Sequence, residues 1–127
     1  MSHTASNPMT SIEISHLHCA RGMGDEFGER LEAMMKIMLD DEDCHEIVLY
    51  RGVKPTGDVP TPKVQFNPVV TEDPDEFCLI VTWTSVDAHN VWTTTAAQPR
   101  VAELIKDMLD GPPRYGNYSF VSRRTGA

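Results

Sequence analysis

The run from Phe77 to Trp83 constrains the fold more than any other part of the chain. It is almost continuously apolar or β-branched and lacks the polar alternation of a strand that faces water on one side. Such a run is typical of a strand at the centre of a sheet. We therefore predict a strand over Glu76 to Thr84. The 127 residues make one modest domain, so few elements are available to cover this sheet.

Three further strands are predicted from shorter patterns. Residues 12–20 alternate and form the first strand. His45 to Val53 forms the second and Tyr115 to Ser122 the last. One face of the first strand carries Ile12, Ile14, His16 and His18, and the other carries Glu13, Ser15, Leu17 and Cys19.

Helical spacing predicts a long helix after the first strand. Asp25 is placed to act as its N-cap, and the helix runs to about Leu39. Apolar side chains recur along it at helical spacing, and we interpret this stripe as ordinary core rather than an adaptable binding surface. Its members are Phe27, Leu31, Met34, Met35 and Met38.

Two shorter helices are predicted in the second half of the chain. Ser85 caps one that runs through Trp92 or Thr93. Pro99 is suited to the first position of the other, which ends at Gly111.

Residues 53–75 are predicted to be a loop or hairpin insertion. Lys54 to Asp75 holds five of the nine prolines and has room for at most a short edge strand near Lys63 to Phe66. We interpret this segment either as a lid or as a variable hairpin extension. Residues 1–10 are predicted to be a disordered tail and residues 123–127 a second tail, so the domain spans 11–122.

The predicted order is β-α-β-β-α-β, the ferredoxin-like pattern of an α+β fold. It gives a four-stranded antiparallel sheet with helices on one face. The other face of the central strands is also apolar and needs a cover. A second copy of the same sheet is the simplest cover, so we expect a homodimer.

Charge and cysteine usage limit the partners. The formal net charge is −8 and no Lys/Arg cluster occurs, which argues against nucleic acid and anionic membranes. No apolar run reaches the length of a membrane span. Cys19, Cys44 and Cys78 have no close pairing, which fits free thiols in a reducing cytoplasm. The absence of a phosphate loop, a Gly-x-Ser-x-Gly elbow and a CxxC motif weighs against nucleotide, flavin, hydrolase and thiol-redox functions.

The segment from Phe77 to Trp92 resembles the signature of the antibiotic biosynthesis monooxygenase family. It has an apolar strand ending in Trp83, the helix cap Ser85, the acidic–alanine pair 87–88 and a later aromatic residue. The element order matches that family over about residues 11–122. The resemblance implies a dimeric α+β barrel with a substrate cleft between the helices and the sheet of each protomer. Many members oxygenate aromatic phenols or quinols with molecular oxygen and no cofactor.

The resemblance also bears on haem chemistry. Trp92, nine residues after Trp83, matches the catalytic Trp of the haem-degrading branch. Ser15 stands where that branch has Asn, and Ala102 stands where it has the haem-ligating His. Haem degradation by that mechanism is therefore not expected, whereas a pocket at the same place is.

His89 and Trp92 are the first catalytic candidates, because residues three apart share a helix face. If that face points into the cleft, His89 is a candidate base and Trp92 an aromatic wall with an N–H donor. The alternative is a core tryptophan and a surface histidine.

His16 and His18 are the second pair of catalytic candidates, since a first-strand histidine can act as a general base. We assign no metal to them, and an interface or core role is the alternative. Predicted substrate contacts are Ser15, Tyr50, Trp83 and Tyr118.

The expected function is a cofactor-independent monooxygenase that oxidises an aromatic or quinol-type small molecule with molecular oxygen. The alternatives are a polyketide cyclase or isomerase on the same dimeric barrel and a non-catalytic small-molecule-binding or stress protein.

Overall fold

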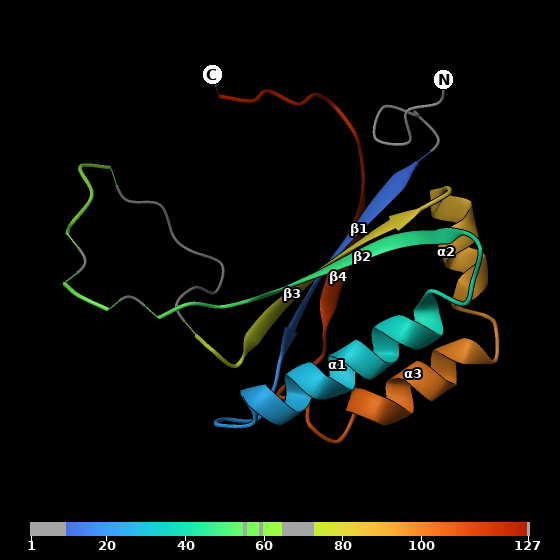
Figure 1. The fold of residues 1–127 in the computed structure, drawn as a ribbon, viewed down its shortest axis with the longest axis horizontal. Coiled ribbons are helices and arrows are strands. Elements are labelled where there is room, and N and C mark those ends of the chain that lie inside the picture. Colours follow the sequence, from blue (N-terminus) through green and yellow to red (C-terminus); the bar gives the residue numbers. More distant parts are fainter. Residues whose placement is uncertain (1–9, 55, 59, 65–72, 127) are drawn as a thin grey trace.

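A computed structural model describes residues 10–54, 56–58, 60–64 and 73–126 (Figure 1). The strands pair antiparallel in the order β2-β3-β1-β4, and the helices lie on one face of the sheet. This arrangement confirms the predicted ferredoxin-like α+β fold. The elements are β1 (Ser11–His18), α1 (Gly24–Met38), β2 (Cys44–Arg51), β3 (Glu76–Trp83), α2 (Val86–Trp92), α3 (Ala97–Ile105) and β4 (Arg114–Ser119).

Strand β3 is central, as its apolar sequence predicts, and it pairs with both β1 and β2. Alternate residues of β3 are buried beneath the helices, where they meet one face of α1. Met34 and Met38 of α1 are buried in this core, and Met35 packs against it. The main buried residues are Phe27, Leu31, Met34, Met38, Phe77, Leu79, Val81 and Trp83.

The start of α1 differs from the prediction. The helix begins at Gly24, so Asp25 is not the N-cap, and Met23 in the cap position has no side-chain hydrogen bond. The carboxylate of Asp75 instead accepts hydrogen bonds from the backbone N–H groups of Gly22, at 2.9 Å, and Gly24, at 3.1 Å. A residue distant in sequence thus satisfies donors that a local cap usually satisfies.

The third helix also differs at both ends. It begins at Ala97, which places Pro99 inside the first turn instead of at its first position. It ends at Ile105, before the predicted stop at Gly111, because the backbone then turns back toward β1. The Met108 carbonyl accepts a hydrogen bond from the backbone N–H of Ala20 at 2.8 Å, which takes it out of a helical path.

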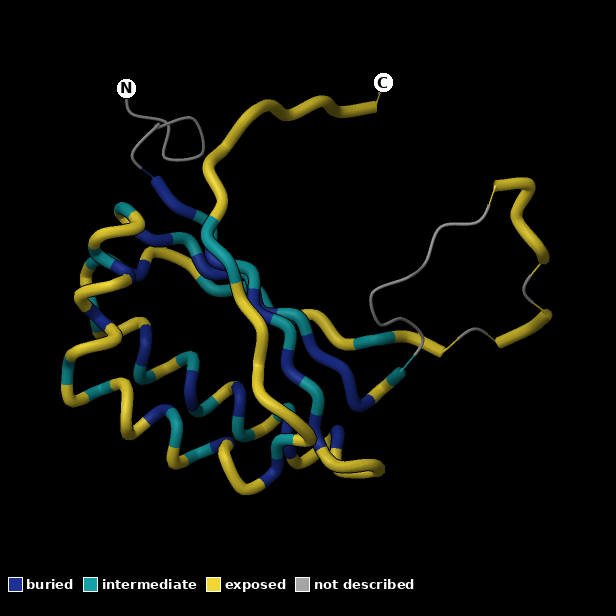
Figure 2. Tube along the Cα trace, turned by 180° about the vertical axis from the view of Figure 1, so that it is seen from behind, coloured by how far each residue is buried: buried dark blue, intermediate teal, exposed yellow. Residues whose placement is uncertain are grey.

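At the end of β4 and in the loops and tails, the structure agrees with the prediction only in part. Strand β4 ends at Ser119, not Ser122, and residues 120–126 continue as exposed chain (Figure 2). Of the predicted edge strand, Lys63 and Val64 form a bend and the rest lies outside the described residues. The predicted tail at 1–10 lies outside them except for Thr10, so the domain division stays a prediction. In the described ranges, no helix is long and apolar enough to span a membrane.

The two faces of the sheet have different surroundings. On β1, the residues under the helices are Ser11, Glu13, Ser15 and Leu17, all buried. We call the opposite side, which none of the described helices covers, the open face. The strand register assigns to it Ile12, Ile14, His16, His18, Val48, Tyr50, Cys78, Ile80 and Tyr118.

Candidate active site

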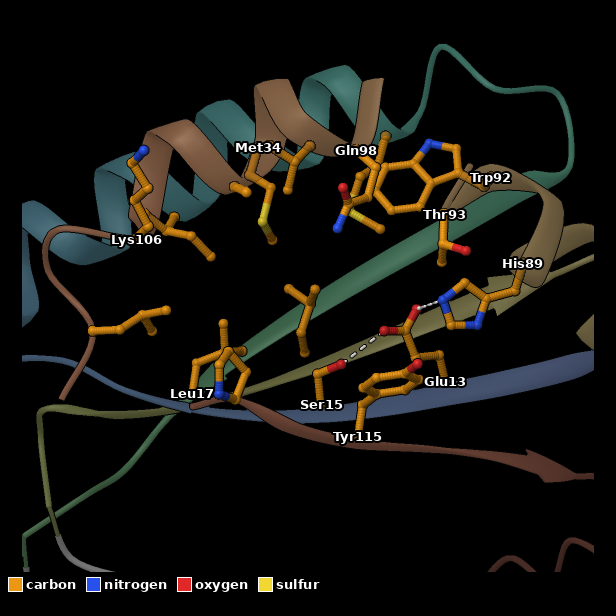
Figure 3. A pocket seen from close by; sticks show the side chains of 17 residues that line it. Glu13, Ser15, Leu17, Met34, His89, Trp92, Thr93, Gln98, Lys106 and Tyr115 are labelled. Carbon is orange, nitrogen blue, oxygen red and sulfur yellow. Dashed lines mark hydrogen bonds and ion pairs between the residues drawn. The ribbon is translucent and has the colours of Figure 1, made fainter. Parts of the chain in front are cut away.

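A cavity of about 470 Å³ lies between the sheet and the helices (Figure 3). This volume falls in the range that holds a drug-sized ligand. Most of its wall is apolar and comes from β1, β3, α1 and α3. The apolar wall includes Leu17, Met34, Met38, Leu79, Val101 and Ile105.

The polar end of the cavity is organised around Glu13 of β1. Ser15 Oγ donates to Glu13 Oε2 at 2.8 Å, and Trp83 Nε1 donates to Glu13 Oε1 at 2.9 Å. His89 Nε2 lies 3.3 Å from the same Oε1 atom. Burying a carboxylate is costly unless it is hydrogen-bonded, and these three groups provide that compensation.

Local sequence explains why His89 reaches this carboxylate. Ser85 Oγ accepts a hydrogen bond from the backbone N–H of Ala88 at 3.0 Å, which confirms the predicted cap and sets the start of α2. His89, one turn into α2, then points toward the sheet and is almost wholly buried. Glu13 and Asn117 are cross-strand partners, so both of their side chains lie beneath His89.

His89 is held from three directions. Its Nδ1 atom lies 2.9 Å from Asn117 Oδ1, its Nε2 atom faces Glu13, and its ring stacks on Trp83 with centroids 4.8 Å apart. Both ring nitrogens are therefore occupied. Glu13 Oε2, by contrast, accepts one hydrogen bond from the described residues and keeps a lone pair for a ligand. Glu13 Oε2 is therefore the acceptor of this cluster that a molecule in the cavity can reach.

Trp92 lines the cavity at one end. Its ring tilts against Trp83, with centroids 5.8 Å apart. Among the described residues, its Nε1 is the one buried side-chain nitrogen or oxygen atom without a hydrogen-bond partner. The nitrogen lies on the edge of the ring turned away from Glu13 (Figure 3). The ring therefore offers the cavity an apolar surface.

Lys106, directly after α3, lines the end of the cavity opposite Glu13 (Figure 3). Its Nζ donates to Glu103 Oε2 at 2.6 Å, and this hydrogen bond raises the pKa of the ammonium group. The side chain is 61% exposed. Its charge is thus both neutralised and in contact with solvent.

The structure divides the eight predicted site residues between two places. Ser15, His89 and Trp92 line the cavity, and Trp83 lies directly behind Glu13 and His89. The open face carries the other four, which are His16, His18, Tyr50 and Tyr118. The roles assigned to all eight stay predictions.

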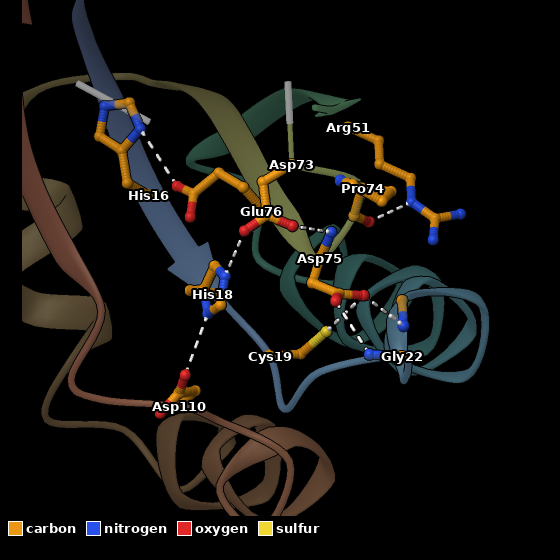
Figure 4. Close-up of polar contacts among 11 residues, drawn as sticks. His16, His18, Cys19, Gly22, Arg51, Asp73, Pro74, Asp75, Glu76 and Asp110 are labelled. Carbon is orange, nitrogen blue, oxygen red and sulfur yellow. Dashed lines mark hydrogen bonds and ion pairs between the residues drawn. The ribbon is translucent and has the colours of Figure 1, made fainter. Parts of the chain in front are cut away.

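The histidines of the open face belong to a separate polar cluster (Figure 4). His18 Nε2 lies 2.7 Å from Asp73 Oδ2, and this hydrogen bond raises the pKa of His18. His18 Nδ1 lies 3.4 Å from Asp110 Oδ2, and His16 Nδ1 lies 3.9 Å from Glu76 Oε2. No group of three or more side chains able to hold a metal ion occurs among the residues that the structure describes.

Sequence reasoning missed Glu13 and Asn117 as site residues, whereas Tyr115 was one of three strand tyrosines considered for orienting a phenolic substrate. Tyr115 lines the cavity, and its ring lies edge-on to His89 with centroids 5.7 Å apart. The sequence did contain a signal for Glu13. Alternate residues of a strand point to the same face, so Glu13 lies on the face of the predicted contact Ser15.

The fold and the cavity together define a small ferredoxin-like domain with a ligand-sized site between its helices and its sheet. No protein-family model and no curated protein matches the sequence. Solved structures do match. An antibiotic biosynthesis monooxygenase, so named, from Bordetella bronchiseptica is 19% identical with a TM-score of 0.71, over 89% of this chain and 98% of that one.

Two further solved structures are similar over comparable lengths. SnoaB, a cofactor-independent oxygenase from Streptomyces nogalater, is 12% identical with a TM-score of 0.64, over 91% of this chain and 95% of its own. A conserved protein from Methanosarcina mazei is 12% identical with a TM-score of 0.65, over 88% and 93%. The chain therefore has the fold of the antibiotic biosynthesis monooxygenases, as the sequence resemblance implied.

Proposed function

We propose that the protein is a cofactor-independent monooxygenase that oxidises an aromatic or quinol-type small molecule in this cavity. The observation that carries the proposal is the Glu13 carboxylate, buried at the polar end of an apolar cavity with a free acceptor position. A buried base beside an apolar wall that can hold the substrate ring is what substrate deprotonation requires. The fold shared with SnoaB, named a cofactor-independent oxygenase, supports the same reaction class.

The proposed reaction begins with proton transfer to Glu13 from an acidic C–H or O–H group of the substrate. The resulting anion gives one electron to O₂, and the two radicals combine to form a peroxide anion on the substrate carbon, which takes the proton back from Glu13 to give a hydroperoxide. Loss of water then leaves a carbonyl group. In sum, one CH₂ group and one O₂ give one C=O group and one H₂O, so the substrate supplies all the electrons.

The other residues of the polar end have supporting roles in this proposal. His89 and Trp83 hold Glu13 Oε1, which leaves Oε2 directed at the substrate. Ser15 donates to Oε2 and so fixes the orientation of the carboxylate. Trp92 supplies a flat apolar wall for an aromatic ring.

Oxygen uptake tests this proposal. Purified, metal-stripped protein is mixed with a panel of anthrones and hydroquinones, and we expect one O₂ consumed for each substrate molecule oxygenated. Glu13→Gln should lower kcat by at least about 100-fold, because proton transfer by a positioned base contributes this much. Glu29→Gln, the same change on the exposed side of α1, is the matched control and should leave kcat unchanged.

An isomerase or cyclase is the second candidate, because the Glu13–Ser15 pair can both take and return a proton. It would convert its substrate equally fast without oxygen and would depend on Glu13 in the same way. Turnover in an anaerobic chamber therefore separates the two candidates. No uptake above the buffer rate, together with anaerobic conversion, would replace the monooxygenase with the isomerase.

We also propose that a second copy of the chain covers the open face. Half-buried Ile12, Ile14, Val48 and Ile80 form an apolar patch there. Patches of this kind on soluble proteins mark interaction sites. The open face continues across all four strands, which suits a twofold contact of sheet on sheet. Light scattering on purified protein tests this directly, with a dimer mass expected.

The cysteines support the expected reducing, cytoplasmic setting. Cys19, Cys44 and Cys78 all lie in the described part of the chain and none forms a disulfide. Cys19 and Cys44 are buried in the core, where free thiols behave as small apolar groups. Free thiols of this kind are usual where glutathione keeps them reduced.

A further inference from the structure

The charges around the cavity are unevenly placed. Among the side chains that line it, Glu13 carries the one carboxylate and Lys106 the one ammonium group. These two lie at opposite ends (Figure 3), and Lys106 is already paired with Glu103. A ligand group at the polar end therefore meets a negative charge without a neighbouring lysine or arginine from the lining.

Apart from the Tyr115 hydroxyl, the side-chain donors around Glu13 are already committed. Trp83 Nε1 and Ser15 Oγ both donate to Glu13. The ring nitrogens of His89 face Glu13 and Asn117. A ligand carboxylate placed here would lie beside another carboxylate and would find no vacant charged donor, which is strongly unfavourable in a buried site.

We infer that the cavity selects uncharged aromatic molecules that carry a hydroxyl group and rejects those that carry a carboxylate in its place. A hydroxyl group can donate to the free position of Glu13 Oε2, and a bond to an ionised acceptor is among the stronger hydrogen bonds. The apolar wall then contacts the ring. This inference rests on the proposed function only in taking the cavity to be the substrate site.

Three naphthalenes with a single substituent at the same position test the inference. These are 2-naphthol, its methyl ether 2-methoxynaphthalene, and 2-naphthoic acid, which is ionised at neutral pH. Their affinities are measured by fluorescence titration under nitrogen, so that no oxygenation occurs. We expect 2-naphthol to bind about tenfold more tightly than the ether, because the ether cannot donate. The acid should bind more weakly than the naphthol by at least about tenfold.

Two variants identify the groups responsible. In Glu13→Gln, the preference for 2-naphthol over 2-naphthoic acid should fall at least about tenfold, since the amide carries no charge. In Lys106→Ala, the preference for 2-naphthol over 2-naphthoic acid should be retained, because the ammonium group is bound to Glu103 and lies at the other end of the cavity. Lys106 is largely exposed, so this variant is expected to fold.

Several outcomes would overturn the inference. One is 2-naphthoic acid binding as tightly as 2-naphthol to the unaltered protein; another is a loss of acid binding in Lys106→Ala. These two comparisons remain decisive if Glu13→Gln fails to fold. Oxygen uptake is a separate readout: discrimination among the probes without uptake would reject the monooxygenase and keep the inference. Oxygen uptake with equal kcat/KM for hydroxylated and carboxylated substrates would keep the monooxygenase and reject the inference.

Discussion

The Trp83 ring lies almost parallel to that of His89, with centroids 4.8 Å and planes 13° apart, and its Nε1 donates to the same Glu13 oxygen that His89 contacts. Trp83 is completely buried at the end of the central strand. The core of the fold and the polar end of the cavity therefore share one side chain. Stability and site geometry are coupled through it.

The two tryptophans provide a matched test of this coupling. Trp83→Phe removes the donor to Glu13 and leaves a buried carboxylate oxygen less satisfied, which costs about 1–3 kcal/mol beyond the loss of ring volume. Trp92→Phe removes a similar volume, but its Nε1 has no partner among the described residues. Urea denaturation should show that Trp83→Phe lowers the free energy of unfolding more. Equal losses would mean that the hydrogen bond to Glu13 contributes nothing measurable.

The features that the sequence predicted correctly depend on nearby residues. The central strand follows from its own apolar run, and the cap of α2 follows from Ser85 and the residues just after it. Helical spacing likewise indicated the core face of α1. Element order and these local signals were sufficient for the ferredoxin-like fold and for a cavity between helices and sheet.

The polar end of the site could not be derived in the same way. On β1, apolar Ile12 and Ile14 suggest that their face belongs to the core, yet the helices cover the face of Glu13 and Ser15. A polar residue on the buried face is stable only because Trp83 and His89 reach it from elsewhere in the chain. Such compensation depends on tertiary structure and leaves no local pattern.

The cap of α1 illustrates the same limit and gives a second prediction. Asp75→Ala removes acceptors from two backbone N–H groups, at Gly22 and at buried Gly24, and should cost about 2–3 kcal/mol of unfolding free energy. Asp25→Ala is the control, because Asp25 is 94% exposed and its ion pair with Arg51 should be worth under about 1 kcal/mol. Thermal or urea denaturation of both variants measures the difference. A larger loss in Asp25→Ala would contradict the structural assignment of the cap.

The contacts of His18 predict how the stability of the fold depends on pH. The hydrogen bond to Asp73 raises the pKa of His18 above its ordinary 6.5, with smaller contributions from the charges of Asp73, Glu76 and Asp110. The backbone N–H of Asp75, followed by His18, lowers the pKa of Asp73 below its ordinary 3.8. The pair therefore stabilises the fold most between these two ordinary values. Its contribution is lost as the pH rises through the raised pKa of His18 or falls through the lowered pKa of Asp73.

Melting temperatures across pH test this window. His18→Gln should lower Tm near pH 5.5, and the difference from the unaltered protein should shrink as the pH rises well above neutrality. In an Asp73→Asn background, His18→Gln should have a smaller effect, because the main partner is already missing. A Tm difference that is constant from pH 5 to pH 9 would show that the charge of His18 plays no part.

The reactivity of the cysteines tests whether a second copy of the chain covers the open face. Burial raises the pKa of Cys19 to about 11 and that of Cys44 to about 12, so neither should react with iodoacetamide in the native protein at pH 7.5. Cys78 is half-buried on the open face, and burial raises its pKa as well. If a second copy covers this face, alkylation of Cys78 should be slow at high protein concentration. Ile14→Glu, on the same face, should give a monomer in light scattering and faster alkylation of Cys78.

A matched change elsewhere completes this test. Val91→Glu places the same charge on an exposed position of α2 and should leave both the dimer and the alkylation rate unchanged. Alkylation is followed by mass spectrometry, which also identifies the modified residue. A monomer at every concentration, or the same Cys78 rate in Ile14→Glu as in the unaltered protein, would mean that no second copy covers the apolar patch. The cavity lies on the other face of the sheet, so that result would leave the proposed chemistry of Glu13 intact.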